Sequence, residues 1–388
     1  MSTIAEAFEK DREVFFLLDL ELDGWHKRLT DCRGGVSVGY SGSDPLLFEG
    51  LMQNTPEVYS SYNLSGRRFS STRMKVVMGN EERFQDIETY IYTHDIACKV
   101  WLWSRSLDFT DIEDYPIFQG TFRKLQHTKY EYSFEILDFT STRGRWVDSL
   151  TVTGNPGAVA KYLTTTYTLC DNDQIDRGSF NNLEDFLTGF SFSVTVDEGA
   201  DIFDVVDRVL AQTSSVRVQR RGKVAVDPFD KFGEVGHVLK QEDLVSDPVV
   251  SLTPFDMVTN RVKVHYNPSA GAYGNTLSID WTNDDLCERS YNTYGEQPER
   301  SFQCPDCATA AQARNCLRRY LDWNAMRHDI VTVLVPYHVG FDMEEGDIAE
   351  LTINEGSGGG WTDEKFMLLD RTFGSSSIRQ RWWRVDTD

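Results

Sequence analysis

Four of the seven cysteines could together hold a metal ion. Cys304 and Cys307 form a Cys-Pro-Asp-Cys motif, with Cys287 before it and Cys316 after it. The C-x-x-C spacing suits adjacent ligands, so four thiolates here could bind zinc or an iron–sulfur cluster.

Four observations favour free thiols at these positions. Only one C-x-x-C pair is present, and burial alone accounts for Cys316, because it belongs to an expected core helix over residues 310–321. If that helix already includes Cys307, the nine residues to Cys316, at about 100° each, put the two side chains on opposite faces. An odd cysteine number in a long chain does not describe a disulfide scaffold, and a Cys304–Cys307 disulfide is less favoured than a metal. We therefore expect buried thiols and no bound cofactor or metal.

Catalytic motifs that a single sequence can show are missing. There is no G-x-x-x-x-G-K-[ST], G-x-S-x-G or H-E-x-x-H, and the seven histidines do not cluster along the chain. The glycine-rich stretch 356–360 lacks both a lysine and a following helix start, which excludes a phosphate cradle. No catalytic residue is predicted.

An acidic loop at Asp171, Asp173 and Asp176 has part of a calcium-binding pattern. An EF-hand loop needs an oxygen ligand at its fifth position and a bidentate carboxylate at its twelfth, where this chain has Ile175 and Asn182. A solvated loop with Asx turns is the preferred interpretation.

The charge of the 388-residue chain restricts its partners. With 39 Lys+Arg and 61 Asp+Glu, the net charge is 39 − 61 = −22. Binding to nucleic acid depends on many basic contacts to phosphate, so this charge disfavours it, and it disfavours anionic membranes likewise. No stretch approaches the ~20 apolar residues of a membrane span. The acidic N-terminus does not suggest a secretory signal, so folding in a cytoplasm is expected.

Three domains are predicted in a multidomain, β-rich α+β chain. Residues 1–150 are predicted to form a β-barrel or sandwich. Its strands alternate apolar and polar residues, most clearly at 130–137, and a short helical piece is expected at 81–89.

Residues 151–242 are predicted to form a small inserted α+β module. Its expected elements are a helix after Asn155-Pro156, a second short helix around 183–187, an amphipathic helix at 202–210 and a hairpin at 216–226. Residues 243–388 read as a second β-rich domain with one helix. The basic and aromatic stretch 379–384 is predicted to be a terminal strand with cross-strand pairs rather than a nucleic-acid groove.

The order of these parts resembles the hub proteins of bacteriophage tail tips and baseplates. The segments that carry the resemblance, in chain order, are 15–28, 116–120 with 134–138, the helix after Asn155-Pro156, Ile175-Asp176, 202–210 with the Gly222 hairpin, 260–264, Ser290-Tyr291, Tyr294-Gly295, 310–321 and Glu345-Gly346-Asp347.

The resemblance implies a structural, non-enzymatic virion protein at the tail tip, assembled in the host cytoplasm. It further implies a homotrimeric ring whose β-rich domains form a pseudo-sixfold collar. Such a collar joins the tail tube and distal tail protein to a central fibre or spike, and surrounds the channel for the tape measure and DNA. An acidic lumen would let DNA pass without binding it.

Two alternatives come from other functional classes. Nine tryptophans, and aromatic residues expected to be exposed such as Trp361, are compatible with a carbohydrate-binding tail module. A cell-wall hydrolase is also compatible if its carboxylates assemble only in space.

Overall fold

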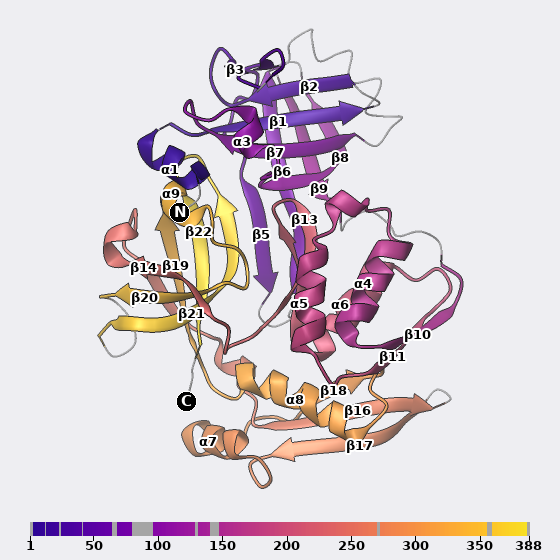
Figure 1. Ribbon diagram of the computed structural model, residues 1–388. Helices are drawn as coiled ribbons and strands as arrows, with labels where there is room; N and C mark the ends of the chain where they lie inside the picture. The colour runs from indigo at the N-terminus through magenta and orange to yellow at the C-terminus, as the bar shows by residue number, and fades with distance from the viewer. Residues whose placement is uncertain are drawn as a thin grey trace.

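A long, mainly antiparallel sheet dominates the computed structural model (Figure 1). The structure describes residues 3–11, 13–22, 25–40, 42–63, 68–79, 96–128, 131–139, 147–269, 272–354 and 359–385. The main path of the sheet runs β15-β19-β22-β21-β5-β6-β9-β8-β7-β1-β2, and β14 joins it through β20, which pairs with β21. Its thirteen strands are β1 (Phe15–Leu22), β2 (Trp25–Thr30), β5 (Val58–Asn63), β6 (Arg68–Gly79), β7 (Ala97–Trp103), β8 (Phe118–His127), β9 (Glu131–Asp138), β14 (Val235–Lys240), β15 (Val249–Leu252), β19 (Asp329–Val335), β20 (Ile348–Ile353), β21 (Trp361–Phe373) and β22 (Ile378–Arg384).

Strands from the two ends of the sequence meet in this sheet. β21 pairs antiparallel with β5 through Phe373 opposite Val58 and Thr372 opposite Tyr59. Helix α1 (Thr3–Lys10) also packs on α9 (Tyr337–Gly340), where the ring of Phe8 lies edge-on to Phe341 at 5.3 Å. One hydrophobic core therefore spans residues near both ends of the chain. The boundaries 1–150, 151–242 and 243–388 remain a prediction.

The α+β module packs beside the sheet, with its helices on the right of Figure 1. Its elements are β10 (Leu150–Gly154), α4 (Pro156–Tyr167), α5 (Arg177–Phe186), β11 (Phe192–Val196), α6 (Ile202–Gln212), β12 (Ser215–Arg220) and β13 (Lys223–Pro228), with the short 3-10 helix η3 (Asn172–Gln174). Asn155 caps α4 by accepting the Gly157 N–H at 2.8 Å, as the Asn-Pro signal predicts. Arg221 and Gly222 both have positive φ, which matches the two-residue turn of the β12–β13 hairpin.

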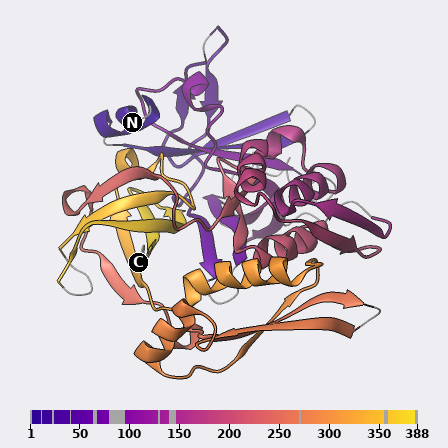
Figure 2. The same ribbon diagram turned by 60° about the horizontal axis from the view of Figure 1, so that its bottom comes forward.

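A smaller sheet and two helices lie under the module (Figure 2). The sheet has the order β17-β16-β18. Its neighbours are the helix predicted at 310–321 and a helix that the sequence pattern does not predict. The bounds are β16 (Arg261–Ser269), β17 (Ala272–Asp280), α7 (Asp285–Tyr294), β18 (Arg300–Cys304) and α8 (Ala310–Asn324). Their apolar residues join the core of the module, so residues 262–325 pack with 139–226 in one cluster. The other short elements are β3 (Val36–Val38), β4 (Leu46–Phe48), α3 (Phe109–Ile112), η4 (Gln241–Asp243) and η5 (Phe255–Met257).

The β-rich α+β class is confirmed, and the predicted C-terminal strand is β22. Trp382 and Trp383 are buried in it, and Arg381 pairs across the sheet with Asp370. The second module helix begins earlier than expected, at Arg177, because Asp176 accepts the N–H groups of Gly178 and Ser179. The helix expected at 81–89 and most of the 356–360 loop lie outside the described residues.

Candidate metal centre

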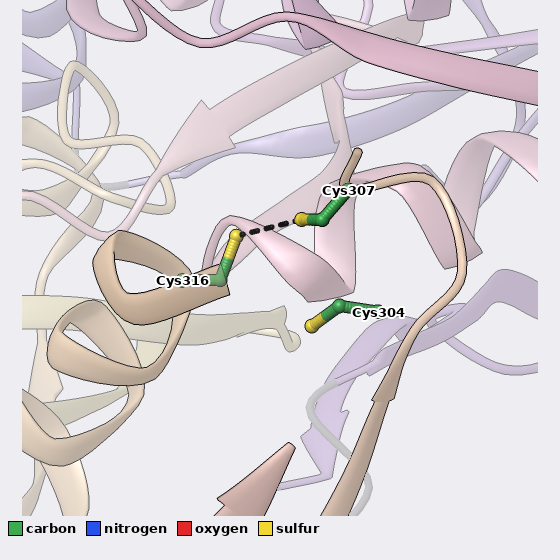
Figure 3. A group of neighbouring side chains, drawn as sticks. All are labelled: Cys304, Cys307 and Cys316. Carbon is green, nitrogen blue, oxygen red and sulfur yellow. Dashed lines mark hydrogen bonds between the residues drawn. The ribbon is translucent and has the colours of Figure 1, made fainter. Parts of the chain in front are cut away.

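Three of the four cysteines considered above come together in the core of the module. Cys304 is the last residue of β18, Cys307 closes the turn after it, and Cys316 lies in the second turn of α8. The side chains of Cys304, Cys307 and Cys316 point towards a common space (Figure 3). Their sulfur atoms all lie within 4.8 Å of one another, and the Sγ atoms of Cys307 and Cys316 are 3.6 Å apart.

The start of α8 explains why these sulfurs meet. The helix begins at Ala310, where Thr309 and Gln312 form a reciprocal capping box. Cys307 therefore lies before the helix and does not follow its angular spacing. Because Cys307 is not part of α8, the expectation that Cys307 and Cys316 lie on opposite faces of one helix does not apply.

The turn between Cys304 and Cys307 is held from several sides. The N–H of Cys307 donates to the carbonyl of Cys304 at 3.2 Å, and the Asn267 N–H donates to the Cys307 carbonyl at 3.0 Å. Within the turn, the Asp306 carboxylate accepts from Gln212 Nε2 at 2.5 Å and pairs with Arg208 Nε at 3.3 Å. These contacts fix the turn against α6 and β16 without a contribution from the sulfurs.

The three thiols influence one another's ionisation. Hydrogen bonds from Cys307 and Cys316 lower the pKa of Cys304 to about 4. The same contacts to Cys304 raise the pKa of Cys307 and that of Cys316.

A cavity of about 880 Å³ opens beside the sulfurs. Cys304 and Cys316 form part of its wall, together with Arg208, Gln212 and Arg300. All three cysteines are buried, with at most 4% of their surface exposed. The cavity is thus the side from which a small ligand could reach the sulfur cluster.

Cys287 does not belong to this cluster. It is buried in α7 within the same core, but its sulfur is not among the three that converge. Burial, followed by the charge of Asp284, raises its pKa to about 12. Cys32, Cys98 and Cys170 are free, buried thiols elsewhere.

A second group of charged residues joins the β12–β13 hairpin to the sheet. Arg220 donates to the carboxylate of Asp227 and, at 2.6 Å, to the carbonyl of Glu345. Arg371 binds the Glu345 carboxylate at 3.1 Å, and His237 lies 3.2 Å from Asp347. Among these contacts, the one between Arg220 and Glu345 joins positions 125 residues apart, so it holds the module against the sheet.

The remaining sequence candidates have structural roles. Asp176 caps α5, and Asp171 forms a reciprocal cap with Gln174, so both carboxylates satisfy backbone N–H groups. The expectation that Trp361 is exposed is wrong: only 4% of its surface is exposed, because its ring packs edge-on against Phe366 in the sheet core. Among the described parts of the chain, no helix is both long and apolar enough to cross a membrane.

The fold matches three solved tail proteins over nearly its whole length. The tail protein from Neisseria meningitidis aligns with a TM-score of 0.54 and 11% identity, over 96% of this chain and 97% of that one. The 43 kDa tail protein of prophage MuSo2 from Shewanella oneidensis gives 0.53 and 10%, over 96% and 98%. The prophage tail protein gp18 from Listeria monocytogenes gives 0.52 and 8%, over 96% and 94%.

No family model matches the sequence, and no curated protein matches it either. The likeness at 8–11% identity concerns the fold. It confirms the fold that the resemblance to tail hub proteins implies.

Proposed function

We propose that the chain is a structural, non-enzymatic hub of a bacteriophage tail tip or baseplate. Three copies would form a ring that joins the tail tube to a central fibre or spike and surrounds the channel for DNA and the tape measure. The observation that carries the proposal is the fold match with three tail proteins, each covering 96% of this chain. A match of that extent takes in the main sheet, the smaller sheet and the module.

The edges of the main sheet give the ring a physical basis. β15 ends the strand order and pairs only with β19 among the described strands, and β14 likewise pairs only with β20. Such edges offer backbone groups to a neighbouring subunit. Strand pairing at these edges would close a ring with heterologous contacts.

The contacts around Arg220 are suited to a protein that must withstand mechanical force in a virion. Arg220, which pairs with Asp227 inside the hairpin, also contacts the Glu345 carbonyl and the Glu344 carboxylate on the sheet side, and removal of one partner leaves a buried charge unpaired. Relative movement of the two parts therefore carries a large energetic cost. We infer that the module and the sheet move together as one rigid body within the ring.

Mass by light scattering combined with two-dimensional electron-microscopy classes tests the hub assignment. We expect a particle of three 44.4 kDa chains and ring-shaped classes with a pseudo-sixfold collar. A stable monomer that joins neither a ring nor a purified tail would contradict the proposal.

Two further assays separate the hub from the other functional classes. Zymography on bacterial cell wall should show no clearing, and a glycan array should show no specific sugar binding. Clearing would contradict the non-enzymatic assignment, and selective sugar binding would support a carbohydrate-binding module instead.

A further inference from the structure

We propose that Cys304, Cys307 and Cys316 bind one Zn²⁺ ion per chain, with a water molecule from the adjoining cavity as the fourth ligand. The sulfur geometry carries the inference. In a tetrahedral site with Zn–S bonds of about 2.3 Å, neighbouring sulfurs are about 3.8 Å apart. Cys307 and Cys316 already stand at 3.6 Å, and the third sulfur lies within 4.8 Å of both. Small side-chain rotations complete the site.

The backbone around the sulfurs is arranged before the metal arrives. The C-x-x-C turn closes on its own hydrogen bond, and Asp306 anchors it to Gln212 and Arg208 of α6. Cys316 is fixed by α8, whose start is set by the Thr309 cap. Since the ligands need no large ordering step, more of the metal's binding energy is retained as affinity.

Access from the cavity side suits an open fourth position. Cys304 and Cys316 line the cavity, and its charged lining residues, two arginines and two carboxylates (Arg208, Arg300, Asp256 and Glu299), balance to zero. Three protein ligands and a water are the arrangement of open zinc sites, whereas closed structural sites have four protein ligands. Cys287 stands apart from the three sulfurs, so it does not close this site.

An iron–sulfur cluster and a disulfide fit these residues less well. Cubane and two-iron clusters are usually held by four cysteines, and three converge here. A disulfide would bring Cys307 and Cys316 from 3.6 Å to about 2.05 Å and leave Cys304 unpaired. Zinc uses all three thiols.

Metal content of the full-length chain tests the proposal. Protein expressed with added zinc and purified in chelator-free reducing buffer is measured for zinc, iron and acid-labile sulfide. We expect one zinc per chain and neither iron nor sulfide. Cys304→Ser and Cys316→Ser should lower the zinc content to near zero, and Cys287→Ser, a buried cysteine of the same core, should retain it.

A second measurement needs no substitution, in case the variants fold poorly. The apo protein, prepared anaerobically with a chelator, is titrated with Co²⁺, which should give the visible bands of a tetrahedral thiolate site at one equivalent. Removal of the metal should also lower the melting temperature of the wild type, because the folded state alone presents the three ligands together.

Several results would overturn the site. They are a reduced wild-type protein that takes up neither Zn²⁺ nor Co²⁺, iron with stoichiometric sulfide, or a Cys307–Cys316 disulfide found by alkylation and mass spectrometry. Zinc retained in folded Cys304→Ser and Cys316→Ser would overturn it as well. None of these results depends on ring formation, so the experiments can contradict the metal site without contradicting the hub function.

Discussion

At the residue scale, Asp227 links the stability of the fold to pH. Its carboxyl is buried between the hairpin and the sheet, beside Arg220. Burial raises the pKa of Asp227 to about 7, although the charge of Arg220 acts in the opposite direction. Gly346 lies directly against this carboxylate, and a Cβ at that position would collide with it. The packing therefore allows little rearrangement when the charge changes.

The sign of the pH effect follows from linkage. An unfolded aspartate has a pKa near 3.9, so between about pH 4 and pH 7 the folded state binds the proton more tightly than the unfolded state. This contribution to stability is complete below about pH 4 and is lost as the pH rises through 7. Asp227→Asn mimics the protonated form and should remove the dependence.

We expect wild-type protein to lose on the order of 1–2 kcal/mol of unfolding free energy, relative to Asp227→Asn, between pH 5.5 and pH 8. Urea unfolding of both proteins at the two pH values measures this difference. Asp227 and Glu234 both line a small surface pocket, and Glu234→Gln, which removes an exposed carboxylate there, is the matched control and should leave the difference unchanged. A constant difference between wild type and Asp227→Asn would mean that Arg220 keeps Asp227 ionised throughout.

The cysteines show which features of the candidate metal site residue spacing predicts and which it does not. The C-x-x-C motif and the core position of Cys316 are legible in the sequence. Whether Cys307 and Cys316 meet depends on where α8 starts. The capping box of Thr309 and Gln312 contains that information, because its pattern places the helix start after Cys307. The contact of Asp306 with Gln212 joins positions 94 residues apart, and no local pattern predicts it.

At the scale of elements, the segment around β15 has the features of a subunit interface. Val245, Val249, Leu252 and Phe255 are exposed over 46–66% of their surface, and they follow one another on an edge strand and its flanks. Apolar residues on an unprotected edge favour pairing with another chain. In the proposed ring, a second copy of this chain would cover them.

Charge on this edge should prevent ring assembly without unfolding the chain. The double variant Val249→Glu with Leu252→Glu adds two negative charges where subunits would meet, so we expect monomers at concentrations at which the wild type is trimeric. The melting temperature should change little, because both side chains are exposed. Light scattering and thermal unfolding give the two readouts.

Leu169→Glu is the matched control, since Leu169 is 58% exposed after α4, away from the sheet edge. It should assemble as the wild type does. If the β15 variant still forms the complete ring, the interface lies elsewhere on the molecule.

Elements were predictable where local signals act alone. The Asn155 cap, the stripe of α6 and the alternation in β9 depend on residues next to one another, and each predicted element is present. The pairing of β5 with β21 is different, because it joins Tyr59 to Thr372 across more than 300 residues. Helix α7 was missed because its capping signal at Asp284 precedes a mostly polar stretch, which lacks a clear apolar stripe.

At the scale of the whole molecule, the net charge of −22 has to be reconciled with the DNA channel of the proposed ring. Binding to DNA releases counterions through contacts between basic residues and phosphates, and an acidic wall cannot make enough of them. A conduit gains from this property, because DNA in transit must not be held. The same charge would carry no benefit if it lay only on the outer face of the ring.

We therefore expect Asp and Glu to concentrate on the lumen-facing surface of the assembled ring. A ring structure by electron microscopy, with its electrostatic potential mapped on the inner and outer walls, tests the distribution. The assembled ring should also fail to retain double-stranded DNA in a filter-binding assay, at low as well as physiological ionic strength, because repulsion is strongest where screening is weakest. A neutral or basic lumen, or DNA retention that increases as salt is lowered, would show that the acidic surface does not serve DNA passage.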